Sequence, residues 1–266
     1  MEIFDFKRFA TYLEYDLNNA KNNFGLTLLI CGLMPAITYI MSGIFSSLLS
    51  GTWVTNAVPA QITAFIIAGI VLILNFPVKV YGGISEKRKG SNWLMIPAST
   101  FEKFLSMILM TVVVLPLCAS ILFFGTDFLM SLFAPGYDTI TELSISNLFK
   151  DSKVDEMLER IGYNGYVESY LQFIMYALMF LLGALCFKSG KVGKTFLVII
   201  GVSIAVSMIF GGIWGNMNFN EEYFETFANE PEDMYRMMRN IGYLTNTIIF
   251  LGLAGGIYYR IRTLKH

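Results

Sequence analysis

Charged residues are scarce in this sequence. They make up 15% of the 266 residues, 19 basic and 20 acidic, whereas a soluble domain carries about 25%. Hydrophobic residues make up 55%, and the mean hydropathy is +0.57. So few charges cannot cover the surface of a soluble domain of this size, and so apolar a composition excludes an intrinsically disordered chain. The composition therefore indicates an integral membrane protein.

Histidine and cysteine are also rare. The one histidine is the last residue, His266, so the body of the chain offers no histidine-based metal site and no Ser-His-Asp triad. Cys31, Cys118 and Cys186 lie within or at the edge of apolar segments, where inert packing is the default and a disulfide framework is not expected. We expect no catalytic residue, no cofactor, no bound metal and no nucleic-acid partner.

The charges that are present leave long gaps between them. Six segments of 18 to 26 residues contain no Asp, Glu, Lys, Arg or His, namely residues 24–49, 57–78, 104–124, 170–187, 195–214 and 241–259. A helix needs about 20 apolar residues to cross the hydrocarbon core, where backbone groups must bond to one another. The sequence therefore predicts an all-α, polytopic fold, one transmembrane domain over residues 1–266 with six membrane-spanning helices.

The connecting segments indicate an orientation. If the N-terminus is cytoplasmic, the inside segments hold 14 of the 19 basic residues and the outside segments hold 14 of the 20 acidic ones. An excess of Lys and Arg marks the cytoplasmic side. Both termini are thus predicted to be cytoplasmic, and residues 125–169 and 215–240 to be external. The external segments show helical spacing at residues 154–161 and 223–227, which is typical of a folded, solvated, acidic cap.

The first 23 residues are polar but show helical periodicity. Phe6, Phe9, Leu13, Leu17 and Ala20 fall on one helix face. This pattern predicts a cytoplasmic amphipathic helix over residues 1–23. It would lie along the inner leaflet or, alternatively, pack on the protein's own cytoplasmic surface.

Proline and glycine mark further features of the spans. Pro35 and Pro116 lie inside the first and third predicted spans, which they are expected to kink. Gly252 and Gly256 form a small-xxx-small face on the last predicted span. Such a face favours close helix packing, within one subunit or across a dimer.

Residues 190–195 read Gly-Lys-Val-Gly-Lys-Thr, which ends like a phosphate-binding loop. The full motif needs a glycine at position 188, which is Lys188 here, and it needs a preceding strand rather than a span. We therefore interpret this segment as a tight cytoplasmic hairpin whose cations orient the chain.

The cytoplasmic segment between the second and third spans, residues 79–103, is the most informative one. It carries the charge run Glu86-Lys87-Arg88-Lys89, and Ser99 and Glu102 further on have the spacing of a capping box. The third helix should therefore begin near Thr100. Taken alone, this segment is a positively charged cytoplasmic loop followed by a well-capped helix.

The stretch Ile96-Pro97-Ala98-Ser99, followed by Glu102-Lys103-Phe104, resembles a pattern of uncharacterised bacterial membrane proteins that are grouped with the ABC-2 type transporter permeases. The plan of the whole chain is similar too: an N-terminal amphipathic helix, six spans, internal termini and a cytoplasmic loop after the second span. Residues 125–169 and 215–240 depart from that pattern, because the first is long and the second is polar.

The resemblance implies a permease subunit of an ATP-binding-cassette exporter in a bacterial cytoplasmic (inner) membrane. A separate ATPase subunit would dock on a coupling loop formed by residues 85–93, and two permease halves would pair, as a homodimer or with a related chain. The implied coupling residues are Ser85, Glu86, Lys87, Arg88, Lys89 and Trp93, with Pro97, Ser99 and Glu102 as scaffold.

With no charge inside the spans to bind an ion, the expected substrate is amphiphilic or lipid-like. The alternative is a membrane protein that transports nothing, such as a sensor, immunity or assembly factor whose acidic external cap binds a partner.

Overall fold

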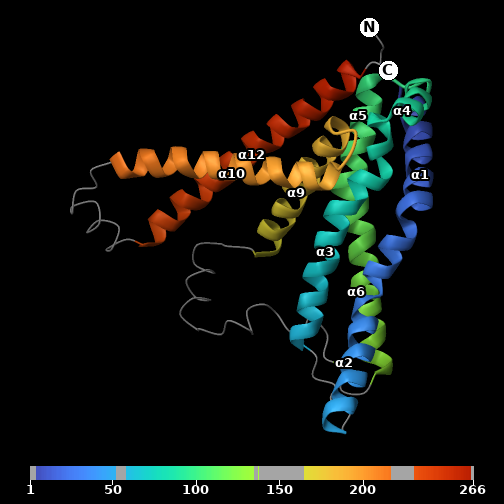
Figure 1. Cartoon of the computed structure of the whole chain (residues 1–266), viewed down its shortest axis with the longest axis vertical. Coiled ribbons are helices and arrows are strands. Elements are labelled where there is room, and N and C mark those ends of the chain that lie inside the picture. Colours follow the sequence, from blue (N-terminus) through green and yellow to red (C-terminus); the bar gives the residue numbers. More distant parts are fainter. Residues whose placement is uncertain (1–3, 52–57, 135–136, 138–164, 217–230, 265–266) are drawn as a thin grey trace.

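The computed structural model describes residues 4–51, 58–134, 137, 165–216 and 231–264, and every regular element within them is a helix (Figure 1). In chain order the elements are α1 (Phe6–Gly32), α2 (Met34–Ser50), α3 (Val58–Val80), the 3-10 helix η1 (Gly82–Ser85), α4 (Lys87–Leu94), α5 (Thr100–Leu109), the π-helical η2 (Met110–Val114), α6 (Leu115–Phe133), α9 (Gly165–Cys186), α10 (Lys191–Asn216) and α12 (Pro231–Thr263). The helical patterns predicted at residues 154–161 and 223–227 lie outside the described residues.

Five helical segments are long and apolar enough to cross a membrane, and a sixth is added if the bent pair α1 and α2 is one span. The five are Gln61–Val80, Thr100–Phe133, Glu168–Cys186, Lys191–Met208 and Arg239–Thr263. Together with the bent pair they overlap the six charge-free segments of the sequence in order. The expected all-helical class is what the structure shows, with five to six potential membrane spans where the sequence predicts six.

The first helix differs from the prediction. Residues 6–23 do not form a separate amphipathic helix, because α1 runs unbroken from Phe6 to Gly32. The chain then bends by 46° at Leu33, where α2 begins with Pro35 in its first turn. Proline is tolerated there because the first helical turn has no partner for its missing N–H. The predicted kink at Pro35 is thus the junction between α1 and α2.

The buried face of α1 is also shifted. Phe9, Tyr12, Asp16, Ala20 and Phe24 are buried. Of the residues predicted to share the apolar face, Phe6 and Leu17 are exposed instead. The buried face includes Asp16 and Tyr12 because both form hydrogen bonds with other segments of the chain. The periodicity of apolar residues alone does not indicate such contacts.

The third span begins as predicted and continues beyond its charge-free segment. Helix α5 starts at Thr100 behind a complete capping box, and after η2 it continues as α6 to Phe133. The apolar continuation at residues 128–133 therefore extends this helix. The π-helical turn comes just before Pro116, which has no N–H to offer the Val112 carbonyl four residues earlier. The Tyr170 hydroxyl donates to that carbonyl instead, at 2.7 Å.

The core lies where α1, α3, α5 and α9 meet. Phe24 of α1 packs edge-on against Phe76 of α3, with ring centroids 5.2 Å apart. Leu178, Leu181 and Ile257 are fully buried between α9 and α12. Helices α10 and α12 diverge from the bundle of α1, α2, α3 and α6 (Figure 1). Their spans bury only 11% and 6% of their residues, so most of their apolar side chains face outward, as lipid-facing helices require.

The two glycines predicted to pack the last span have different surroundings. A Cβ placed on Gly256 would lie 3.5 Å from the Leu182 side chain of α9. A Cβ on Gly252 would meet nothing within 4 Å in the described part of the chain. Gly256 therefore packs within the subunit, and contact of Gly252 across a dimer stays a prediction. Cys31, Cys118 and Cys186 are all free thiols.

Candidate functional site

One end of the molecule gathers the segments that carry most of its polar contacts. The N-terminal part of α1, helix α4, the start of α5, the connection between α9 and α10 and the C-terminal end of α12 all lie there (Figure 1). We call this region the polar end. It brings together the four segments that the charge distribution predicted to share one side of the membrane.

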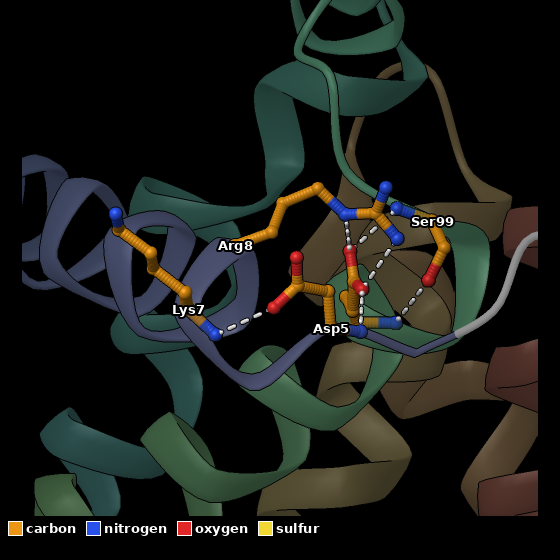
Figure 2. A network of polar contacts seen from close by, with 5 residues as sticks. Asp5, Lys7, Arg8 and Ser99 are labelled. Atoms are coloured by element: carbon orange, nitrogen blue, oxygen red, sulfur yellow. Dashed lines mark hydrogen bonds and ion pairs between the residues drawn. The ribbon is translucent and has the colours of Figure 1, made fainter.

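Glu102, in the first turn of α5, is the centre of the polar end. Its side chain is completely buried and forms an ion pair with Arg8 of α1 at 2.7 Å. Arg8 donates through Nη2 to Oε1 and through Nε to Oε2 at 2.8 Å, which is the bidentate geometry that makes arginine–carboxylate pairs strong. Figure 2 shows Arg8, Asp5 and Ser99 gathered around this carboxylate.

Two backbone N–H groups complete the shell of Glu102. The Asp5 N–H donates to Oε1 at 3.0 Å, and the Ser99 N–H donates to Oε2 at 2.8 Å. In return the Glu102 N–H donates to Ser99 Oγ at 3.2 Å, which closes the predicted capping box. One carboxylate therefore caps α5 and also holds the start of α1 against it.

Glu102 and Asp16 have different polar partners. Glu102 accepts two of its four hydrogen bonds from the Arg8 guanidinium, a cation that stabilises the ionised carboxylate. Asp16 is buried as well, and it accepts hydrogen bonds from the hydroxyl groups of Ser106 and Tyr81. The charge of Glu102 is thus matched by a cation, whereas Asp16 is held by neutral hydroxyl donors.

Asp16 joins three segments of the chain. The Ser106 hydroxyl of α5 donates to Oδ2 at 2.8 Å, and the Tyr81 hydroxyl, just after α3, donates to the same oxygen at 3.0 Å. Tyr81 is fully buried, and burial together with the neighbouring Asp16 carboxylate raises the pKa of its phenol. Tyr81 therefore remains a proton donor to Asp16 throughout the physiological range.

Helix α4 is attached to the polar end through Trp93. The Trp93 indole N–H donates to the Tyr12 hydroxyl of α1 at 3.0 Å. Lys103 of α5 donates to the Trp93 carbonyl at 3.1 Å, and its ammonium group lies 4.5 Å from the centre of the indole ring. The C-terminal end of α4 is thus bound to both α1 and α5.

The segment before α4 is attached to α9 and α10. Ser85 donates to the carbonyl of Phe187, in the α9–α10 connection, at 3.0 Å. Lys191, the first residue of α10, donates to the Gly82 carbonyl and forms an ion pair with Glu86 at 3.2 Å. This lysine belongs to the segment that resembles a phosphate-binding loop, and its ammonium group is held by the protein itself.

These contacts divide the predicted coupling residues into two groups. Ser85 and Trp93 are buried, so their side chains hold α4 in place and are not on the surface. Glu86 is partly exposed and pairs with Lys191. The structure describes the backbone of Lys87, Arg88 and Lys89 as the first turn of α4, and their side chains lie outside what it describes. Of the scaffold residues, Ser99 and Glu102 form the capping box and Pro97 is exposed.

Several residues of the polar end were not predicted from the sequence. Asp16, Tyr12 and Arg8 lie on α1. The sequence places Lys103 in the Glu-Lys-Phe pattern and Lys191 among the cations that set the orientation, and neither observation predicts their contacts. One signal was available: Asp16 is spaced seven residues after Phe9 and eight before Phe24, on the face that the helix buries. A carboxylate on a buried face needs a partner, and the sequence does not say which one.

The polar end anchors a short helix, α4. Among the described residues no group of three His, Cys, Asp or Glu side chains is placed to hold a metal ion. Comparison of the chain with protein-family models, with curated proteins and with solved structures gave no match. The class is therefore defined by the chain itself. It is an all-helical protein with five to six potential membrane spans, and a short helix is held by polar contacts at one end.

Proposed function

We propose that this protein is the permease subunit of an ATP-binding-cassette exporter in a bacterial cytoplasmic membrane, and that α4 is its coupling helix. The observation that carries the proposal is the anchoring of α4. This eight-residue helix is tied through Trp93 to α1 and α5, and through residues 85 and 86 to the α9–α10 connection. A motor subunit that pushes on α4 would therefore move several helices at once.

The mechanism follows from these contacts. Closure of two ATPase subunits would press on the first turn of α4, which carries Lys87, Arg88 and Lys89. The buried hydrogen bonds of Trp93 would pass the displacement to α1 and α5, because buried polar contacts keep their geometry while exposed ones exchange with water. The contacts of residues 85 and 86 would pass it to the α9–α10 connection. Rocking these helices against a paired permease chain would open a path for an amphiphilic substrate.

The proposal is tested by reversing the charges on α4. We expect that replacing Lys87, Arg88 and Lys89 together by glutamate lowers the amount of ATPase that co-purifies with the tagged chain at least tenfold, because opposed charges at an interface weaken it strongly. The measurement is quantitative mass spectrometry of the complex extracted from native membranes, together with the ATPase activity of the same sample.

The matched control reverses Lys188 and Lys194, two exposed lysines near the α9–α10 connection at the same end of the molecule. Co-purification should be close to that of the unmodified chain. An ATPase yield unaffected by the triple reversal would show that α4 is not the docking element. If no ATPase co-purifies with the unmodified chain, the protein belongs to the non-transporting class, and partners captured through residues 125–169 become the ones to identify.

A further inference from the structure

An apolar groove with a volume of about 220 Å³ runs along α1. One wall is a stripe of α1, the floor includes Phe76 of α3, and the opposite wall is formed by η2 and the start of α6. The lining residues are Leu17, Ala20, Lys21, Phe24, Gly25, Leu28, Phe76, Met110, Val114, Leu115 and Cys118. Apart from the Lys21 ammonium group, these side chains offer a surface of hydrocarbon and sulfur.

Two features of the sequence create this groove. Gly25 has no side chain, and a Cβ placed there would meet only the Lys21 stem, at 3.8 Å. On the other wall, the π-helical turn of η2 interrupts the regular α-helical spacing just where Met110, Val114 and Leu115 line the groove. A large side chain at position 25 would therefore occupy space that the glycine leaves open on this wall.

The charge at the mouth of the groove is positive. Lys21 is exposed, and no carboxylate among the described residues pairs with it. Lys79 lies 5.9 Å from the ring centre of Phe24, which lines the groove, and donates to Thr27 Oγ1 at 2.7 Å. Asp16, the carboxylate that precedes Lys21 on α1, already accepts hydrogen bonds from Ser106 and Tyr81. An anion at the mouth would therefore meet the Lys21 ammonium group, with no carboxylate of the described residues paired to it.

The position of the groove along the chain matches the boundary of a bilayer. Lys21 is the last charged residue before the charge-free segment 24–49, and the rest of the α1 wall reaches Leu28 inside that segment. A lysine at this position can place its ammonium group among headgroups while its stem lies along apolar surface. On α1 the groove therefore begins at the edge of the predicted span and continues into it, and its opposite wall, from Met110 to Cys118, lies within the charge-free segment 104–124.

We propose that this groove is a binding site for one acyl chain of an anionic phospholipid, whose headgroup lies on Lys21. At about 220 Å³ the groove is smaller than the 300–1,000 Å³ or so of a pocket for a drug-sized ligand. Its small volume and its apolar lining suit a single hydrocarbon chain. The site is independent of the exporter proposal, since it needs only the bilayer.

The test is native mass spectrometry of the full-length detergent-solubilised protein, titrated with phosphatidylglycerol or with phosphatidylcholine of the same acyl chains. The unmodified protein should bind one phosphatidylglycerol about fivefold more tightly than phosphatidylcholine, the contribution of one lysine near an anionic surface. Lys21→Gln should remove this preference. Gly25→Leu, which fills the groove, should weaken the binding of both lipids, and Cys118→Phe should do the same from the opposite wall.

Matched controls separate the groove from general effects. Lys7→Gln removes an exposed charge from the same helix outside the groove, and Gly69→Leu adds the same side chain where a Cβ meets nothing within 4 Å. Both controls should bind lipid like the unmodified protein. Equal affinity for the two lipids, an equal effect of Lys7→Gln and Lys21→Gln, or displacement of the lipid by glycerol phosphate alone would each overturn the proposal.

Discussion

Replacing Glu102 with alanine is expected to lower the thermal unfolding midpoint of the purified protein by about 10 °C. The substitution removes the acceptor of four hydrogen bonds, two from Arg8 and one each from the Asp5 and Ser99 backbones. The loss of the capping box and of the acceptor for the buried Ser99 N–H together costs about 3 kcal/mol, whereas Arg8, 38% exposed, can turn to water. A change of 1 kcal/mol shifts the midpoint of a protein of this size by about 3 °C. The measurement is thermal unfolding in detergent, followed by intrinsic fluorescence or by aggregation.

The effect should be specific to the buried carboxylate. Glu14→Ala removes an exposed carboxylate from α1 and should leave the midpoint within about 1 °C, as expected for exposed groups. Equal midpoints for Glu102→Ala and Glu14→Ala would contradict the central place of Glu102 in the polar end.

Replacing Gly183 with alanine is expected to destabilise the protein by about 3 kcal/mol, at the upper end for an overpacked core. The new Cβ would lie 1.9 Å from Thr195 Oγ1 and 2.8 Å from Thr195 Cβ. Rotation of the threonine can move its hydroxyl, which donates to the Lys191 carbonyl at 2.7 Å, but it cannot move its Cβ. Helices α9 and α10 would have to separate at the point where Gly183 lets them touch.

The cause can be isolated with a second substitution. In a Thr195→Gly background the three clashing atoms are gone, so Gly183→Ala should become neutral or stabilise the protein by up to about 1 kcal/mol through its better helix propensity. Gly201→Ala, where a Cβ would meet nothing within 4 Å, should behave in the same way in the unmodified protein. Denaturant or thermal unfolding of the five proteins gives the comparison. A destabilisation by Gly183→Ala that persists without Thr195 would contradict this contact.

Features determined by neighbouring residues could be predicted from the sequence. The capping box of Ser99 and Glu102 needs only their spacing of three, and the helix begins at Thr100 as predicted. The charge-free segments follow from the cost of charge in a bilayer, and each corresponds to an apolar helix or to the bent pair α1 and α2. Pro35 marked the bend, although the sequence placed a helix boundary near residue 23 that the structure does not have.

Contacts between distant segments could not be predicted. Arg8 and Glu102 are 94 positions apart, and Lys191 and Glu86 are 105 apart. Which lysine stays on the surface and which is buried depends on how the helices pack, and periodicity gives no information on that. Trp93 illustrates the same limit: in a charged loop it resembles a docking residue, and in the structure it is the buried anchor of α4.

We expect the polar end to face the cytoplasm and residues 125–169 and 215–240 to face the other side of the membrane. Ser189 tests it well, because its connection between α9 and α10 contacts the segment before α4. In a background with Cys31, Cys118 and Cys186 replaced, single cysteines at Ser189 and at Asn218 are treated with a membrane-impermeant maleimide. In intact cells the maleimide should label only the cysteine at position 218. The cysteine at position 189 should react only after permeabilisation. Labelling of both positions from the same side would contradict it.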